Sequence, residues 1–444
     1  MSEKGHNFRL NLLIIMNEHC LGRVGTYMDI KERNRKFMEV VSCFLKGQKI
    51  QWEEDISEKE WESLFELSIQ HQILPIFFET VYSCPAFASL SKEKVQWIKH
   101  QMFCQIIVQN RKTEEFLGLY KRLLEADLTP IVVKGIICRS LYREPDYRAS
   151  GDEDLLIPAE EFDSYREIFL KNGMKYMDPS ADVEKEGEVP FYKEGGALRI
   201  ELHKELFPSE SQAYGYFNRV FENSFTNKII FDVKGVPIYT LNHTDHLLYL
   251  LMHAFKHFLH SGFGVRQVCD IVLYTNTYGK EIDWTHVYNT MAEIHGELFS
   301  ASIFDIGSRY LNFDMEKACY PKTWRRIKAN GEELLEDLIA GGIFGNSSIS
   351  RKHSSNITLQ AVTEKKEQGK IKKPLIWQCV FPDMKYMERT YSYLKTYPFL
   401  LPVAWISRLK RYQREMKQKQ NNDARKSIEI GNRRVNLMKK YKII

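Results

Sequence analysis

The stretch Arg148-Ala-Ser-Gly-Asp-Glu-Asp-Leu-Leu-Ile157 decides the fold and also carries the most informative pair of side chains in the chain. Asp152 and Asp154 stand one residue apart at the start of an apolar run that is typical of a buried strand. Because successive side chains of a strand point to opposite faces, Asp152 and Asp154 share a face and Glu153 points away. Paired carboxylates on a rigid strand suit a hard divalent cation such as Mg²⁺ (or Mn²⁺), and that cation suits phosphate chemistry. The alternative is a turn in which the aspartates accept backbone amides.

Upstream, the run Leu128-Thr-Pro-Ile-Val-Val-Lys134-Gly135 combines a strand signal with a glycine turn. The β-branched residues 131–133 predict a strand, and Gly135 allows a tight turn into a helix that begins near Ile136. Amides at a helix start attract phosphate oxygens, and Lys134 would add a point charge there. An ordinary surface position is the alternative for Lys134.

Downstream, residues 197–203 alternate apolar and polar side chains, as a half-buried strand does. Glu201 and His203 would share one face of that strand. If the strand pairs beside the one that carries Asp152 and Asp154, Glu201 becomes a third carboxylate at the same metal site. The alternative for Glu201 is a solvated strand position.

This order of motifs, together with Tyr142-Arg-Glu-Pro-Asp-Tyr-Arg148, resembles an uncharacterised nucleotidyltransferase family of the DNA polymerase beta superfamily over roughly residues 60–275. The superfamily pattern is a glycine turn, then Asp-x-Asp on one strand, then a third acidic residue on another. The resemblance therefore implies that Gly135 takes the turn, Asp152 and Asp154 hold the metal, and Glu201 is the third carboxylate. The chain departs from the pattern at Lys134-Gly135, where Gly-Gly or Gly-Ser is usual, and at Glu201, where Asp is commoner.

The resemblance implies Mg²⁺-dependent transfer of a nucleoside monophosphate from a nucleoside triphosphate to an unidentified hydroxyl acceptor on a sugar, a small molecule or a protein. Members of the family often accompany bacterial polysaccharide genes, so a link to polysaccharide biosynthesis is expected. Around the nucleotide we expect four groups in the core: Lys134, Gly135, Arg148 and His203. Arg148 has the alternative of pairing with Asp146. Two other functions stay open: a catalytically inactive nucleotide-binding module, and a basic-armed nucleic-acid or membrane-surface protein whose acidic triad is incidental.

The apolar run that begins near residue 244 predicts a helix on which His253 and His257 lie four residues apart, on one face. Zinc sites use this spacing, but the sequence offers no obvious third ligand. The alternatives are histidines bonded at a domain seam, and a face that closes over the nucleotide so that His253 or His257 contacts phosphate.

Periodicity along the chain predicts an α+β fold, in which a small mixed-sheet nucleotidyltransferase palm is flanked by N-terminal and C-terminal helical regions. Strands are expected at residues 131–133, 152–157, 174–177, 191–193, 198–203, 228–231 and 236–240. The expected divisions are a peripheral extension (1–27), an N-terminal helical region (28–125), the nucleotidyltransferase core (126–240), a helical domain that closes the cleft (241–344), a polar flexible linker (345–374) and a C-terminal segment with a basic arm (375–444).

Composition is that of a chain with enough apolar residues for several cores, 43% of 444, and without any run of 18 apolar residues. None of the eight cysteines forms Cys-x-x-Cys, so we expect reduced thiols and a cytoplasmic location. Oligomeric state stays open.

Charge is unevenly distributed along the chain. Residues 408–444 contain 13 Lys or Arg and three acidic residues, a balance of +10, so the remaining 407 residues sum to −5. We expect this arm to be a solvated helix and expect no nucleic-acid partner, while peripheral contact with an anionic membrane is the alternative. Residues 397–408 have the apolar-then-basic order of an interfacial anchor. Because they contain two prolines, we expect Phe399, Leu400, Leu401 and Trp405 to pack onto the body instead.

Overall fold

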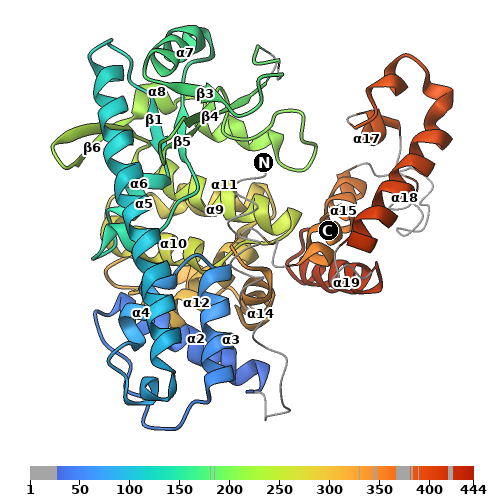
Figure 1. Cartoon of the computed structure of the whole chain (residues 1–444). Coiled ribbons are helices and arrows are strands. Elements are labelled where there is room, and N and C mark those ends of the chain that lie inside the picture. The colour runs from blue at the N-terminus through green and yellow to red at the C-terminus, as the bar shows by residue number, and fades with distance from the viewer. Residues whose placement is uncertain are drawn as a thin grey trace. The chain divides into compact units, whose positions relative to one another are not determined.

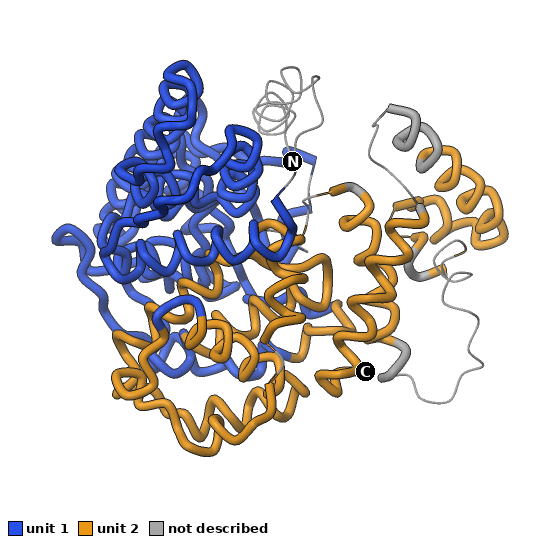
Figure 2. The backbone as a smooth tube through the Cα atoms, turned by 90° about the horizontal axis from the view of Figure 1, so that it is seen from below, with its two compact units in different colours: residues 1–210, 217–246, 310–312 blue, residues 211–216, 247–309, 313–444 orange. Residues whose placement is uncertain are grey.

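The computed structural model describes residues 28–366 except 181, 185, 330, 344, 346 and 347, and then residues 381, 384–388, 390–418 and 424–444. The chain forms two compact units, which Figure 2 distinguishes by colour. The first contains residues 1–210, 217–246 and 310–312, and the second contains residues 211–216, 247–309 and 313–444. The expected extension 1–27 and residues 367–374 of the expected linker lie outside the described residues.

A seven-stranded mixed sheet forms the centre of the first unit and confirms the α+β fold (Figure 1). Its strand order is β3-β4-β5-β2-β1-β7-β6. β2 pairs antiparallel with β1 and parallel with β5, while β1 pairs parallel with β7. The strands are β1 (Ile131–Val133), β2 (Glu153–Leu156), β3 (Met174–Tyr176), β4 (Glu188–Lys193), β5 (Arg199–His203), β6 (Ile229–Val233) and β7 (Val236–Thr240).

Each strand has the burial that its sequence pattern indicates. The continuous apolar run of β1 is buried at all three positions, as expected for a strand in the middle of a sheet. In β5, Ile200 and Leu202 are buried while Glu201 on the other face is partly exposed, which is the period of two of a half-buried strand. The helix that follows β2 ends before Gly173, whose φ of +77° suits a glycine at the end of a helix.

The first unit also contains helices, and its N-terminal ones pack on one another and on α5. The N-terminal ones have recognisable starts: Asp29 caps α2, and Ser57 with Glu60 forms a capping box on α3. They bury a group of aromatic side chains that includes Phe37, Trp61 and Phe77. These helices are α2 (Ile30–Leu45), α3 (Glu58–Gln70), α4 (Leu74–Val81), α5 (Lys92–Leu124), α6 (Gly135–Arg139), α7 (Phe162–Lys171) and α8 (Ser224–Asn227).

The described part of the second unit is helical. Its first helix, α9 (His243–His260), begins in the first unit and belongs to the second from residue 247 onward. The others are α10 (Val265–Tyr278), α11 (Trp284–Glu293), α12 (Glu297–Tyr310), α13 (Lys322–Arg325), α14 (Gly331–Gly341), α15 (Ile349–Lys366), α17 (Met384–Glu388), α18 (Leu401–Gln418) and α19 (Ala424–Lys440). None of the described helices combines the length and the apolar character needed to cross a membrane.

The expectation of a flexible linker is wrong for residues 349–366, which form helix α15 and pack against α19. The polar composition suggested a solvated segment, but hydroxyl side chains here donate to carbonyls of their own helix instead of to water. Ser354 Oγ, for example, donates to the Arg351 carbonyl at 2.7 Å. The Arg351 guanidinium is buried and lies 2.7 Å from Asp337 Oδ2. A buried ion pair and two buried apolar residues, Ile357 and Val362, therefore hold a segment that looks polar on average.

Candidate active site

The register of the β2–β5 pair brings two of the three expected acidic residues together, Asp154 and Glu201, whereas Asp152 stands directly before β2 and outside this pairing. The two strands are parallel, and Asp154 is the direct neighbour of Glu201. His203 lies two residues further along β5, on the same face as Glu201. One ligand atom each from Asp154, Glu201 and His203 can be chosen so that all three lie within 4.8 Å of one another. The conditional expectation that these strands pair is therefore confirmed.

His203 is the centre of this group. Its Nε2 lies 3.4 Å from Asp154 Oδ1 and 3.7 Å from Glu201 Oε2, and its Nδ1 lies 3.9 Å from Glu188 Oε2 on the neighbouring strand β4. The side chains of Asp154 and His203 are 4% and 6% exposed, whereas that of Glu201 is 29% exposed. Glu201 is therefore the member of this group that solvent reaches most.

The electrostatics of the group show an excess of negative charge. Burial raises the pKa of Asp154, but the Lys134 ammonium and the nearby His203 ring outweigh burial and hold that pKa far below its usual range. Burial also raises the pKa of Glu201, to about 7. The charges of Asp152 and Asp154 add to this rise, while the contact with His203 opposes it. Burial and the charge of Asp154 also raise the pKa of Asp152. Two of the three carboxyls thus resist ionisation, which is the situation that an added cation relieves.

Two protein cations already lie within this group. Burial lowers the pKa of His203, but its contacts with the carboxylates of Asp154 and Glu201 outweigh burial and raise that pKa to about 10. Lys134 Nζ lies 2.8 Å from Asp154 Oδ2. Positive charge is therefore present on both oxygens of Asp154, where the sequence predicts a metal ion.

Lys134 and Gly135 form the sharp turn between β1 and α6. Lys134 has φ +60° and ψ −112°, and Gly135 has φ +25°. A Cβ atom at Gly135 would lie 2.1 Å from Glu153 Oε2, so no other residue fits this position without displacing Glu153. The turn is therefore specified both by backbone conformation and by a buried carboxylate behind it.

Two amides of this turn, those of Lys134 and Ile136, already have acceptors within the protein, which corrects the expectation of phosphate binding for these two groups. The Ile136 N–H donates to Glu153 Oε2 at 2.8 Å, and the Lys134 N–H donates to His246 Nε2 at 3.2 Å. α6 is also only five residues long. The Lys134 side chain is the group of this turn that remains directed at the acidic cluster.

Glu153 faces away from the aspartates, as expected, and accepts a hydrogen bond from the Ile136 N–H on the far side of the turn. Its side chain is fully buried, and its Oε1 accepts hydrogen bonds from Arg139 Nη1 at 2.8 Å and from Ser150 Oγ at 3.2 Å. One carboxylate thus connects the loop before β2, the start of α6 and the Gly135 turn. Alternation of faces predicts only that Glu153 points away from the aspartates, and this role was missed.

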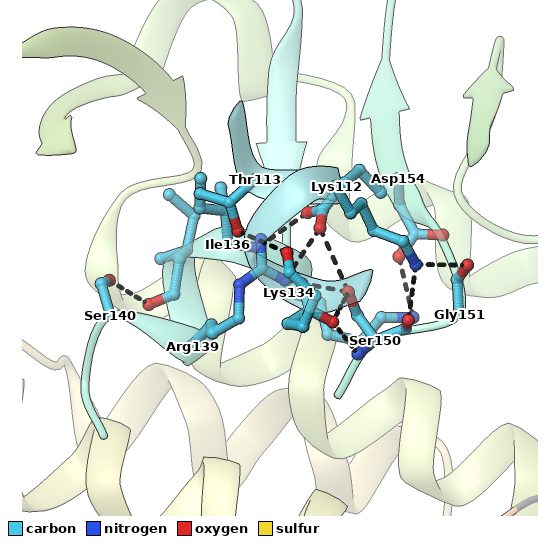
Figure 3. Close-up of polar contacts among 12 residues, drawn as sticks. Lys112, Thr113, Lys134, Ile136, Arg139, Ser140, Ser150, Gly151 and Asp154 are labelled. Atoms are coloured by element: carbon cyan, nitrogen blue, oxygen red, sulfur yellow. Dashed lines mark hydrogen bonds and ion pairs between the residues drawn. The ribbon is translucent and has the colours of Figure 1, made fainter. Parts of the chain in front are cut away.

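Helix α5 supports the loop that leads into β2. Lys112 Nζ donates to the Ser150 and Gly151 carbonyls at 2.6 and 2.7 Å (Figure 3). Gln109 Oε1 accepts from the Ser150 N–H at 2.8 Å. Burial lowers the pKa of Lys112 to about 8. Burying a lysine ammonium is costly unless it donates hydrogen bonds, and the Ser150 and Gly151 carbonyls accept them. These two bonds therefore hold the loop that leads to Asp152.

The same helix supports the approach to β5. Glu115 Oε2 accepts hydrogen bonds from the Ala197 and Leu198 N–H groups, both at 2.9 Å, and Arg111 Nη2 donates to the Gly195 carbonyl at 2.8 Å. One helix therefore fixes the segments that precede both acid-bearing strands. Sequence reasoning missed these residues because their partners are backbone groups far away in the chain.

His246 supports the Lys134–Gly135 turn through a hydrogen bond to its backbone. It is fully buried, its Nε2 accepts from the Lys134 N–H, and its Nδ1 lies 3.2 Å from Thr240 Oγ1. Because the Thr240 hydroxyl donates to the Val132 carbonyl at 2.7 Å, the His246 proton is on Nδ1 and points at Thr240. Burial, together with the charge of His243, lowers the pKa of His246 to about 3. The ring is therefore neutral and oriented.

The remaining expected site residues are not part of this group in the described structure. Arg148 is buried, at 2% exposure, in the segment before β2. His253 and His257 belong to the second unit, where their Nε2 atoms lie 3.3 Å apart. Among the described residues the group of three ligands does not include either histidine. The roles of all three residues toward a nucleotide stay predictions.

Comparison with known proteins gives one match. The model of a family described as uncharacterised nucleotidyltransferase matches residues 57–312, more than half of the chain. The matched range contains all seven strands and every candidate site residue, and it extends further toward the C-terminus than the resemblance noted from the motifs. No curated protein and no solved structure matches the chain.

Proposed function

The chain belongs to the uncharacterised nucleotidyltransferase family, and from this premise we propose that it transfers a nucleoside monophosphate from a nucleoside triphosphate to a hydroxyl group. The observation that carries the proposal is the β2–β5 register, which sets Asp154 beside Glu201 with His203 between their oxygens. Nucleotidyl transfer needs converging carboxylates of this kind, because the reacting phosphates and pyrophosphate are highly charged.

The donor groups fit Mg²⁺ or Mn²⁺. Asp152, Asp154 and Glu201 offer carboxylate oxygens, which both ions prefer. The His203 imidazole would become a ligand only on losing its proton, and Mn²⁺ tolerates such a ligand better than Mg²⁺. Lys134 and His203 already bring positive charge to the oxygens of Asp154. When bound, a divalent ion would neutralise the triphosphate and hold it in line with the attacking oxygen.

The chain's own groups then have separable roles. Lys134, whose side chain is 17% exposed, would move from Asp154 to a phosphate oxygen when a cation takes its place. Glu201, the most exposed of Asp154, Glu201 and His203, would accept the proton of the attacking hydroxyl. His203 would keep Asp154 and Glu201 oriented. Pyrophosphate leaves as the new phosphoester bond forms.

The acceptor is a hydroxyl group on a sugar, a small molecule or a protein side chain. We keep a link to polysaccharide biosynthesis as part of the proposal, because members of this family often accompany polysaccharide genes. Nothing in the described residues singles out one acceptor class, so the experiment must sample all three.

The test is incubation of the full chain with each α-phosphate-labelled nucleoside triphosphate and Mg²⁺, with and without a lysate fraction from the producing cells. We expect pyrophosphate release and transfer of label to an acceptor, both lost in Asp154→Asn. The matched control is Glu194→Gln, an exposed carboxylate in the turn after β4 that pairs with Lys175 and should leave activity unchanged. Nucleotide binding without pyrophosphate release from any triphosphate would instead favour an inactive binding module.

A further inference from the structure

Exposed apolar side chains gather at the start of α18 and in the turn before it. Phe399 is 75% exposed, Val403 51% and Ile406 54%, and Tyr397 beside them is 51% exposed. Val403 and Ile406 are three residues apart on α18, and Phe399 lies one turn before Val403, in the 3₁₀ turn Pro398–Leu400. They therefore form one face, which we call the α18 outer face.

The opposite side of α18 is already packed. Ala404 is fully buried with Met387 and Leu394, and Leu401 and Trp405 pack against this small core. Leu400 does so too, but Phe399 does not, so the expectation that all four residues of this stretch pack inward is wrong for Phe399. Pro402 is tolerated because it stands in the first turn of the helix. Helix α18 thus has two apolar faces, of which one is packed against the small core and the other, the α18 outer face, is exposed.

Positive charge continues the outer face along the helix. Lys410, four residues after Ile406, is exposed, as is Arg411. They begin the segment 408–444, whose balance of +10 contrasts with −5 for the rest of the chain. Aromatic and aliphatic side chains followed by lysine and arginine are the composition of a helix that lies in a membrane interface.

We infer that the α18 outer face docks on the surface of an anionic lipid bilayer. Phe399, Val403 and Ile406 would enter the boundary between headgroups and acyl chains, and Lys410 and Arg411 would meet the lipid phosphates. Charge argues against a second copy of the chain as the occupant, because pairing two such faces would bring two strongly positive segments together. This inference does not depend on the proposed function.

The test is co-sedimentation of the full chain with vesicles of phosphatidylcholine, and with vesicles that also contain phosphatidylserine. We expect binding to the second kind alone, weakened by salt. The double variant Val403→Asp with Ile406→Asp should lower the affinity on the order of 100-fold. Lys410→Gln with Arg411→Gln should lower it about 30-fold and reduce the salt dependence.

The matched control is Ile107→Asp with Val108→Asp on α5, which removes aliphatic side chains that are 63% and 53% exposed and should not change lipid binding. Far-ultraviolet circular dichroism of each variant establishes that it is folded. Equal binding to both kinds of vesicle, no binding at all, or an equal loss in the control would overturn the inference. So would a dimer in sedimentation velocity that Val403→Asp with Ile406→Asp converts to a monomer, because the face would then be a self-interface.

Discussion

Replacing Gly135 with alanine should strongly lower the free energy of unfolding of the protein. The new Cβ would lie 2.1 Å from Glu153 Oε2 and 3.1 Å from its carboxyl carbon, so Glu153 must move. A carboxylate at the end of a flexible side chain often moves at little cost. Glu153 is different because it is fully buried and held by the Arg139 guanidinium and the Ile136 N–H, both at 2.8 Å.

The expected size of the effect follows from these contacts. Displacing Glu153 breaks a buried ion pair and leaves Arg139, 1% exposed, without its counterion, a change that costs about 3–5 kcal/mol. The backbone adds strain, since φ at Gly135 is +25° and an L-residue pays about 1–2 kcal/mol for left-handed conformations. We expect Gly135→Ala to lower the free energy of unfolding by about 4 kcal/mol or more, a large part of the roughly 5–15 kcal/mol typical of a folded protein.

Urea denaturation followed by far-ultraviolet circular dichroism measures this change. Gly118→Ala is the matched control, because Gly118 lies inside α5 and a Cβ there meets no atom within 4 Å. That variant should be more stable than the wild type by about 0.5–1 kcal/mol. A Gly135→Ala protein within about 1 kcal/mol of the wild type would refute the reasoning, because Glu153 would then not be fixed.

Three further predictions concern buried polar groups. Lys112→Met should lower the free energy of unfolding by about 2–4 kcal/mol in the same urea assay, because it leaves two loop carbonyls without a donor; no loss would mean that water replaces the lysine. His246 takes up a proton below about pH 6.5 when unfolded but only near pH 3 when folded, so the unfolded chain binds more protons between these values and stability is lost as the pH falls through this window. Between pH 7 and 5, protonation of His246 should lower the free energy of unfolding by about 2 kcal/mol. Comparison with His246→Gln, which should not show this loss, isolates the contribution of the histidine. An equal dependence of stability on pH in both proteins would contradict the prediction. Asp337→Asn should cost about 3–5 kcal/mol because it leaves two buried guanidinium groups without a carboxylate, while Glu332→Gln, in an exposed pair, should cost less than about 1 kcal/mol.

Local sequence pattern was enough to locate the strands. The β-branched run gave β1 at residues 131–133, and the alternation of residues 197–203 gave β5 to within one or two residues. Because these signals depend on side-chain period and not on tertiary contacts, they are visible in a single sequence. The pairing of β2 with β5 is a tertiary fact, and the sequence could state it only as a condition.

The supporting residues could not be predicted for the same reason. Lys112 and Glu115 look like ordinary polar residues of a long helix, and their partners are backbone groups about 40 and 80 residues away. His246 stands in a helix start that sequence analysis treated only as apolar, and its role depends on a turn 112 residues earlier. Helix α15 was missed because average polarity does not register a buried Arg351–Asp337 pair.

The central claim is that carboxylates from β2 and β5 hold one divalent ion for a nucleoside triphosphate. The most direct measurement is calorimetric titration of Mn²⁺ into the full chain in the presence of a non-hydrolysable triphosphate, for the wild type, Asp154→Asn and Glu201→Gln. We predict a site whose affinity falls at least about tenfold, about 1.4 kcal/mol, in either variant. Unchanged Mn²⁺ affinity in both variants would contradict the claim.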